Sequence, residues 1–289
     1  KNIYLTGSRN GFIFVSKYDS TGVLIWNTDF DKKYNGYGND IAIDQFDNVF
    51  VIGGGGWNFF MAKLNFYGET VWAKNIQVNS SDGFNPNDID VDALGNVYFA
   101  ATFGVDSIKL DDIEIKQKGS TFWGKLDSNG KFIWAKAAKG TTTDTPQIAL
   151  ASDNHIYISG SFSERLSIEN TVLNGPCCSG PKPYIAKYDL QGNFIWAKTT
   201  NGEGNTKEVK LDLDGNLYLT GTNFDCFGVF CTEYDYYIEK YGSSGNLIWR
   251  KDFKNSSYDL AEGMDIDNNG FLYVAAYTLA ENSIDEKSK

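Results

Sequence analysis

The amino-acid sequence predicts an all-β fold, a β-propeller built from four-stranded antiparallel blades. Two short sequence units alternate along the 289 residues, and each consists of two extended, aromatic-rich stretches joined by a tight turn. No stretch between them has the apolar periodicity of a helix. A β-sandwich does not repeat its own sequence in this way, so the repeat favours the propeller.

The first unit has the pattern K-[YL]-x-x-x-G-x-x-[IV]-W. Its glycine supplies the positive φ that a tight hairpin turn requires, and extended stretches lie on both sides of it. We therefore expect each copy to form one β-hairpin. The copies lie at residues 17–26, 63–72, 125–134, 187–196 and 240–249.

The second unit is a strand, a turn of Asx-Gly type and another strand. The turn Asp92-Ala93-Leu94-Gly95-Asn96 represents it and suits a tight reversal. With the strands of a blade labelled a to d in chain order, this unit supplies strands a and b, and the first unit supplies c and d. Its copies lie at residues 41–53, 89–100, 148–160, 209–221 and 264–275, and its second half opens the chain at residues 2–7.

Together the two units predict one propeller domain over residues 1–289 with five to six blades, six being favoured. The first blade lacks strand a, and six copies of strand b stand against five of strand d. Either the ring has a sixth, incomplete blade, or the chain is cut from a longer one. The blade repeats lie near residues 1–30, 40–78, 88–138, 147–200, 207–253 and 262–279.

Charge and hydropathy narrow the classes of partner. The chain has 26 basic and 37 acidic residues and a net charge of −11, so it lacks the basic surface that binds nucleic acid or an anionic membrane. No apolar run approaches the ~18 residues that a membrane-spanning helix needs, and no charged-then-apolar leader begins at Lys1. We expect neither a nucleic-acid partner nor a membrane-spanning segment.

Four cysteines occur as two local pairs, Cys177 with Cys178 and Cys226 with Cys231. An even number of cysteines in loops favours disulfides and an oxidising compartment, with three connectivities open. Metal binding is the competing interpretation. Because the only histidine, His155, lies far from the cysteines in sequence, we predict neither a metal nor another cofactor.

The pattern D-x-x-G-N-x-Y-x-x-G, a variable insert, and then F-x-x-K-Y-D-x-x-G-N-x-x-W-A-K resembles the bacterial β-propeller repeats called SBBP, and is similar to NHL-type blades. The resemblance covers residues 2–277, and departs from the pattern where Leu64-Asn65 and Tyr241-Gly242 replace the Tyr-Asp pair. It implies that strand a is innermost. It also implies a secreted or cell-surface protein, outer-membrane associated if it is of the Bacteroidetes type. It implies no activity, because a scaffold defines the family.

Irregular length is confined to one kind of connection. The a–b and c–d turns keep their length, whereas the b–c connection is long in the third, fourth and fifth blades. Long loops on a rigid scaffold commonly bind partners, and aromatic side chains there suit a protein or a sugar ring. The alternative is that these aromatics pack the inserts onto the blades. In blades that resemble the NHL type, the b–c and d–a connections share one face. The candidate binding residues on that face are Trp57, Tyr34, Tyr37, Phe84, Tyr234 and Tyr258.

Other repeated residues have structural interpretations. The five tryptophans of the first unit are expected to pack between blades, and the aspartates that end strand a to accept hydrogen bonds from turn amides. Strand a also carries the charges Asp90, Lys210 and Asp265 at its middle. We expect them to line a solvated channel.

We therefore predict a non-catalytic secreted or cell-surface propeller that acts as a protein-binding scaffold in a larger envelope assembly. Two alternatives stay open. One is a carbohydrate-binding propeller that uses the loop aromatics. The other is a hydrolase or lyase that uses carboxylates such as Asp88, Asp90 and Asp265, although the sequence contains no recognisable catalytic constellation.

Overall fold

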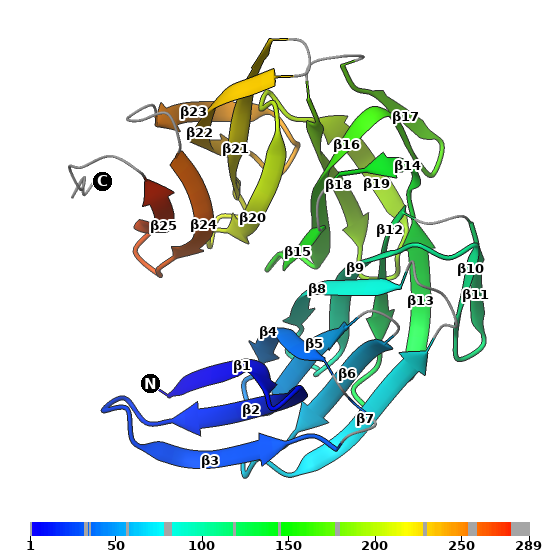
Figure 1. The fold of residues 1–289 in the computed structure, drawn as a ribbon, viewed down its shortest axis with the longest axis vertical. Helices are drawn as coiled ribbons and strands as arrows, with labels where there is room; N and C mark the ends of the chain where they lie inside the picture. Colours follow the sequence, from blue (N-terminus) through cyan, green and yellow to red (C-terminus); the bar gives the residue numbers. More distant parts are fainter. Residues whose placement is uncertain are drawn as a thin grey trace. The chain divides into compact units, whose positions relative to one another are not determined.

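The computed structural model describes most of the chain as β-strands, and the chain divides into two compact units, residues 1–139 and 140–289 (Figure 1). Four-stranded antiparallel sheets recur in both units, as the sequence predicts. The described residues are 2–31, 34, 36–55, 58–77, 83–117, 120–143, 146–176, 180–227, 230–253 and 259–278.

The first unit contains three blade-like sheets and one separate hairpin. The sheets have the orders β1-β2-β3, β4-β5-β6-β7 and β8-β9-β12-β13, and the hairpin is β10-β11. Each sheet follows the chain order, as a meander of adjacent hairpins must. The strands are β1 (Ile3–Arg9), β2 (Phe12–Tyr18), β3 (Leu24–Asp29), β4 (Tyr37–Ile43), β5 (Val49–Gly55), β6 (Asn58–Leu64), β7 (Thr70–Gln77), β8 (Phe84–Val91), β9 (Val97–Phe103), β10 (Ser107–Leu110), β11 (Ile113–Lys116), β12 (Ser120–Leu126) and β13 (Phe132–Ala137).

The second unit also contains three sheets. The first pairs β16 with β14, β15, β17 and β18, and β18 with β19; the second has the order β20-β21-β22-β23, and the third is β24-β25. The strands are β14 (Lys139–Thr142), β15 (Gln147–Leu150), β16 (His155–Ile168), β17 (Thr171–Asn174), β18 (Lys182–Asp189), β19 (Phe194–Thr199), β20 (Asn205–Leu211), β21 (Leu217–Phe227), β22 (Phe230–Tyr241), β23 (Leu247–Phe253), β24 (Asp259–Ile266) and β25 (Leu272–Thr278).

Strand pairing confirms both hairpin units. In every c–d hairpin the repeated lysine lies opposite the repeated tryptophan, as Lys63 does opposite Trp72, and the register shifts just after the lysine. Strand b occurs six times among the described residues and strand d five times, as the sequence predicts. The first sheet therefore consists of strands b, c and d, and the last of a and b.

The interior of each unit is formed mainly by strands b and c. Residues 49–52 of β5 are all 0% exposed, because this strand has another strand on each edge and a neighbouring sheet on each face. In the third sheet of the first unit, Phe99 and Phe122 pack with ring centroids 5.5 Å apart, and Phe59 of the preceding sheet joins them. Aromatic side chains thus fill the space between sheets.

The repeated tryptophans connect successive blades, which confirms that prediction where the structure shows the contact. Trp26 donates its Nε1–H to the carbonyl oxygen of Phe66 at 3.0 Å, and a β-carbon on Gly68 would lie 2.6 Å from its ring. Trp72 is related in the same way to Ser128 and Gly130. Each indole therefore covers the turn glycine of the next c–d hairpin, where a side chain would not fit.

The turn aspartates also behave as expected. Asp212 accepts hydrogen bonds from the backbone amides of Asp214 and Asn216. Burial would raise the pKa of Asp212, but its hydrogen bonds with Asn216 and Lys240 outweigh burial and hold the pKa below its usual range. A backbone hydrogen bond from Phe271 is the main cause of a lowered pKa at Asp267.

These pKa shifts predict acid destabilisation. A carboxyl group whose pKa is lower in the folded state stabilises the fold above its unfolded pKa of about 3.9, and this stability is lost as the pH falls further. We expect the free energy of unfolding to be flat from pH 7 to 5 and to fall below about pH 4. Urea unfolding at several pH values measures this. A loss centred between pH 6 and 7, or none by pH 3, would contradict the role of the turn aspartates.

Candidate functional site

The three long b–c connections fold as β-hairpins, which we call the insert hairpins. The first is β10–β11, the second is the distal part of β16 with β17, and the third is the distal part of β21 with β22. By contrast, β1 and β2 are joined by the two-residue turn Asn10-Gly11, whose positive φ values of 54° and 82° suit a tight hairpin. The connections of variable length therefore form paired β-strands, and their length differs from blade to blade.

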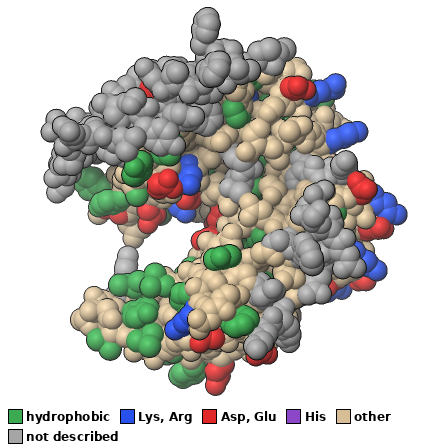
Figure 2. Space-filling view, in the orientation of Figure 1, with side chains coloured by type: hydrophobic (Ala, Val, Ile, Leu, Met, Phe, Trp, Pro, Cys, Tyr) green, Lys and Arg blue, Asp and Glu red, His purple; other side chains and the backbone are tan. Residues whose placement is uncertain are grey.

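The first insert hairpin has one apolar face and one charged face. Ile108 and Leu110 are buried in the core of the first unit, while Lys109, Glu114 and Lys116 are exposed. This alternation follows from the two-residue period of a strand. Both acidic and basic side chains appear over the outer side of β10 and β11 in Figure 2.

The tip of this hairpin is anchored to two strands. The Asp111 carboxylate accepts hydrogen bonds from the Lys74 ammonium at 2.8 and 2.9 Å and from the backbone amide of Phe132 at 3.1 Å. Burial would raise the pKa of Asp111, but these contacts outweigh it and the pKa is lowered. The carboxylate therefore stays charged at neutral pH and holds the hairpin on β7 and β13.

The second insert hairpin repeats this design in the second unit. Leu166 and Leu173 are buried, whereas Glu164, Arg165 and Val172 are exposed, and β17 contacts strand d of its own blade, β19. The outward face therefore carries different charges from those of the first insert hairpin, on a backbone that is paired in the same antiparallel way.

In the third insert hairpin the backbone register places Cys226 directly opposite Cys231. Opposed residues of an antiparallel pair have Cα atoms about 4.5–5.5 Å apart, within the range that a disulfide spans. We predict a Cys226–Cys231 disulfide, to be recovered as one cross-linked species by peptide mapping without reduction. A link from either residue to Cys177 or Cys178, which lie outside the described residues, would contradict this prediction.

The structure places the predicted binding aromatics in different environments. Phe84 was expected on an exposed loop and this is wrong: it begins β8, is only 5% exposed, and packs 5.7 Å from Phe59 between ring centroids. Tyr34 is half-buried, 4.9 Å from the Phe60 ring, and Tyr37 is 67% exposed. The remaining candidates lie outside the described residues or side chains: Trp57, Tyr234 and Tyr258.

The strand-a charges lie on separate strands of both units. In the first unit, Asp90 accepts a hydrogen bond from the backbone amide of Val91 at 2.8 Å. In the second, Lys210 forms an ion pair with Glu208 on its own strand at 3.1 Å, and Asp265 accepts from the backbone amide of Ile266. These contacts are local to each strand, so a channel lined by all three charges stays a prediction.

A β-bulge in strand a is a feature that the sequence reasoning missed. The pairing of β8 with β9 shifts between Pro86 and Asp88, and β4, β20 and β24 shift at the corresponding place. Next to the bulge in β8, the carboxylates of Asp40 and Asp88 both accept from the amide of Ile89 at 3.0 Å. A bulge inserts one unpaired residue and redirects side chains, which explains why alternation alone misplaces strand-a residues.

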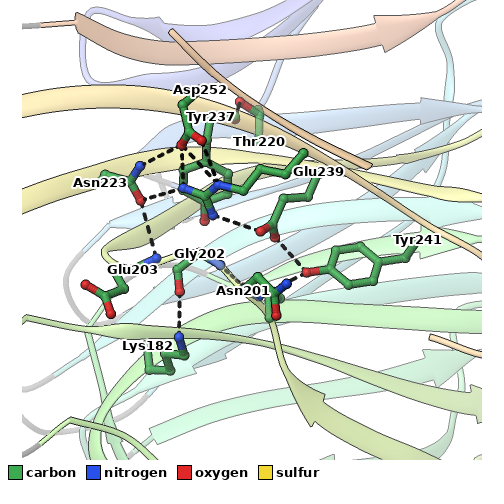
Figure 3. A network of polar contacts seen from close by, with 12 residues as sticks. Lys182, Asn201, Gly202, Glu203, Thr220, Asn223, Tyr237, Glu239, Tyr241 and Asp252 are labelled. Carbon is green, nitrogen blue, oxygen red and sulfur yellow. Dashed lines mark hydrogen bonds and ion pairs between the residues drawn. The ribbon is translucent and has the colours of Figure 1, made fainter. Parts of the chain in front are cut away.

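A polar network in the second unit was also missed. Figure 3 shows Glu239, Asn223 and Asp252 in it, and Arg250 contacts all three. Glu239 on β22 and Arg250 on β23 are cross-strand partners, and their charged atoms lie 2.8 Å apart, with the Glu239 side chain fully buried. Arg250 also pairs with the Asp252 carboxylate at 2.6 Å. The corresponding cross-strand pair in the preceding blade is Ala186 and Ala197.

The network extends to the connection between β19 and β20. The Tyr241 hydroxyl donates to Glu239 at 2.7 Å and accepts from the backbone amide of Asn201 at 3.1 Å. Burial, followed by the nearby Glu239 charge, raises the pKa of Tyr241, so the hydroxyl keeps its proton and remains a donor. Asn223 accepts from Arg250 and from the amide of Glu203. Because two carboxylates surround one guanidinium, the network positions this connection and is not arranged to bind an anion.

Neither a metal centre nor a spanning helix occurs in the part of the chain that the structure describes. These residues contain no group of three or more His, Cys, Asp or Glu side chains placed to hold a metal ion. Across the same residues, no helix has the length and apolar character needed to cross a bilayer.

Comparison with known proteins relates the chain to repeat and propeller proteins at low sequence identity. No protein-family profile matches it. An uncharacterised WD repeat-containing protein of Acanthamoeba polyphaga mimivirus is 23% identical over 314 residues, which cover 91% of this chain and 20% of that protein. The chain thus spans about a fifth of the length of this curated relative.

Solved structures agree on the fold. A protein from Lactobacillus plantarum superposes with a TM-score of 0.56 at 14% identity, over 96% of this chain and 75% of that one. A puromycin hydrolase gives 0.56 at 10% identity, over 95% and 42%. The apocarotenoid oxygenase of Synechocystis gives 0.52 at 10% identity, over 95% and 64%. The chain is a β-propeller of antiparallel sheets with a distant WD-repeat relative.

Proposed function

We propose that this propeller is a non-catalytic scaffold of the SBBP type, secreted or held at the cell surface, that binds a protein partner through the outward faces of its insert hairpins. The repeat pattern supports the SBBP assignment, because its repeated positions form the turns and inter-blade contacts seen in the structure. The facing cysteines of the third insert hairpin support an oxidising compartment.

The insert hairpins carry the proposal. The first and the second each have a buried apolar face, yet their outward faces differ and mix both signs of charge, at Lys109 and Glu114 in the first and at Glu164 and Arg165 in the second. Each of these outward faces, taken by itself, has mixed charge, which suits recognition of a protein with complementary charges. It suits a sugar less well, because Phe84 and Tyr34 pack inward and leave fewer aromatic rings available for stacking.

Affinity capture from the envelope of the source cells, followed by cross-linking, tests this function. The test variant is Glu114→Lys with Glu164→Lys on the insert hairpins, and the matched control is Glu69→Lys with Asp214→Lys at exposed turns, which changes the net charge equally. We expect the original chain and the control to capture the same partner, and the test variant to lose roughly tenfold or more of the affinity. Equal capture by both variants would refute the assignment to the insert hairpins.

A further inference from the structure

The sequence contains six Asn-Gly pairs, and this dipeptide can undergo a reaction between its own atoms. The glycine amide nitrogen attacks the side-chain Cγ of the asparagine, and nothing hinders its approach because glycine has no side chain. A glycine N–H that donates a hydrogen bond must first leave its acceptor, which slows the attack. The pairs begin at residues 10, 35, 129, 174, 201 and 269.

Five of the six glycine amides donate hydrogen bonds in the folded chain. In two turns the acceptor is the carbonyl oxygen of the aspartate three residues earlier, Asp127 for Gly130 at 2.9 Å and Asp267 for Gly270 at 3.0 Å. The other three bonds join Gly36 to the carbonyl oxygen of Gly11 at 3.1 Å, Gly175 to that of Glu164 at 2.7 Å, and Gly202 to the hydroxyl of Thr200 at 3.1 Å.

Gly11 differs from these five glycines. It is the second residue of the two-residue turn between β1 and β2, where the strand ladder ends at the pair of Arg9 with Phe12. Neither Asn10 nor Gly11 belongs to the ladder, and the Gly11 amide donates to no residue that the structure describes. Both residues are exposed. The Gly11 nitrogen is therefore available to attack, and water reaches the pair.

We propose that Asn10 is a deamidation site, the one Asn-Gly pair that the fold leaves open to conversion into isoaspartate. The Gly11 nitrogen bonds to Cγ of Asn10 while the bond from Cγ to Nδ2 breaks, and ammonia leaves with the proton of the Gly11 amide. Water then opens the five-membered imide, placing a hydroxyl on one carbonyl carbon and a hydrogen on the Gly11 nitrogen.

The place of opening decides the product. Opening at the main-chain carbonyl carbon of Asn10 gives isoaspartate, and opening at Cγ gives aspartate. In both cases one water is consumed and one ammonia is released, so the reaction needs no oxidant and no other co-reactant. The site is separate from the insert hairpins, and it therefore goes beyond the function proposed above.

Isoaspartate at residue 10 would alter the turn. Its main chain runs through the former side-chain methylene, which adds one atom to a turn whose two residues have φ values of 54° and 82°. A two-residue hairpin turn depends on these positive values, so we expect the adjacent pair of Arg9 with Phe12 to open. The hydrogen bond from Gly36 to the Gly11 carbonyl oxygen links this turn to the segment that precedes β4, and it would be disturbed as well.

Incubation of the folded chain at mildly alkaline pH tests the proposal, because base removes the amide proton of the attacking nitrogen. Peptide mapping by mass spectrometry measures the conversion at each asparagine. A methyltransferase that esterifies isoaspartate with labelled S-adenosylmethionine measures the isoaspartate formed. We expect Asn10 to convert roughly 2- to 10-fold faster than each of the other five asparagines, from the usual net strength of one hydrogen bond.

Unfolding supplies the first control. In concentrated urea the hydrogen bonds of all six glycines are lost, so the six pairs should react at similar rates and the excess at Asn10 should disappear. Conversion at Asn10 that is no faster than at the other five in the folded chain overturns the proposal. So does an equal excess at Asn10 in urea, because the neighbouring sequence and not the turn is then the cause.

Two variants supply the second control. Asn10→Gly keeps a residue that suits the turn and should remove most of the methyl label from the folded chain. Asn129→Ser introduces the residue that the fifth blade has at this position, Ser244, and should leave the label nearly unchanged. Thermal melting shows that both variants are folded. A label that persists in Asn10→Gly, or that is lost in Asn129→Ser, also overturns the assignment to Asn10.

Discussion

Arg250→Ala is expected to lower the free energy of unfolding by about 3–5 kcal/mol, the usual cost of removing one partner of a buried ion pair. The substitution leaves the fully buried Glu239 carboxylate without its guanidinium, and Asp252 and Asn223 lose the same partner. The Arg250 guanidinium also lies 4.4 Å from the centre of the Tyr237 ring. Chemical unfolding monitored by tryptophan fluorescence measures the loss.

The repeat itself supplies the control for this prediction. Two of the four equivalent cross-strand pairs are Ala62 with Ala73 and Ala186 with Ala197, so the fold accepts two alanines at this position. Glu239→Ala combined with Arg250→Ala should therefore recover a large part of the stability that Arg250→Ala loses, because no buried charge remains. If the double variant loses as much free energy of unfolding as Glu239→Ala and Arg250→Ala lose in sum, the two residues are not coupled.

Gly130→Ala is expected to lower the free energy of unfolding by about 2–5 kcal/mol. Gly130 has a φ of +82°, which costs a residue with a side chain about 1–2 kcal/mol. Its new β-carbon would also lie 2.8 Å from the ring of Trp72, and overpacking of this kind adds about 1–3 kcal/mol. Thermal and urea unfolding both report the effect.

Gly22→Ala separates the two contributions. Gly22 occupies the same turn position in the first blade with a φ of +84°, but nothing lies within 4 Å of the place that a β-carbon would take. Its substitution should cost only the backbone strain. Equal losses at Gly22 and Gly130 would mean that the contact between Trp72 and the next turn contributes little to stability.

The sequence predicted the fold well because the blade framework repeats. Each copy of the lysine and tryptophan pattern has the same cross-strand register, so one interpretation applied to every blade. The residues that differ between copies were harder to place. Phe84 was misjudged because strand a begins before its β-bulge. The alternation of side chains counted back from Ile89 is interrupted at the unpaired residue of the bulge, so it does not predict that Phe84 is buried.

The insert hairpins and the Arg250 network had weak but readable signals. Alternating apolar and charged residues on both sides of Asp111-Asp112 are typical of a hairpin. Aligning the repeats position by position would have shown Glu239 and Arg250 replacing two small residues together. Their pairing still required the strand register, which is a property of the folded sheet.

Hydrogen exchange measured by mass spectrometry, with and without the captured partner, tests the central claim most directly. Binding through the insert hairpins predicts added protection at residues 107–116 and 164–174, with little change at the a–b and c–d turns. Protection confined to turns such as residues 92–96 and 127–131, with none at the insert hairpins, would contradict the claim that this propeller presents its inserts to a protein partner.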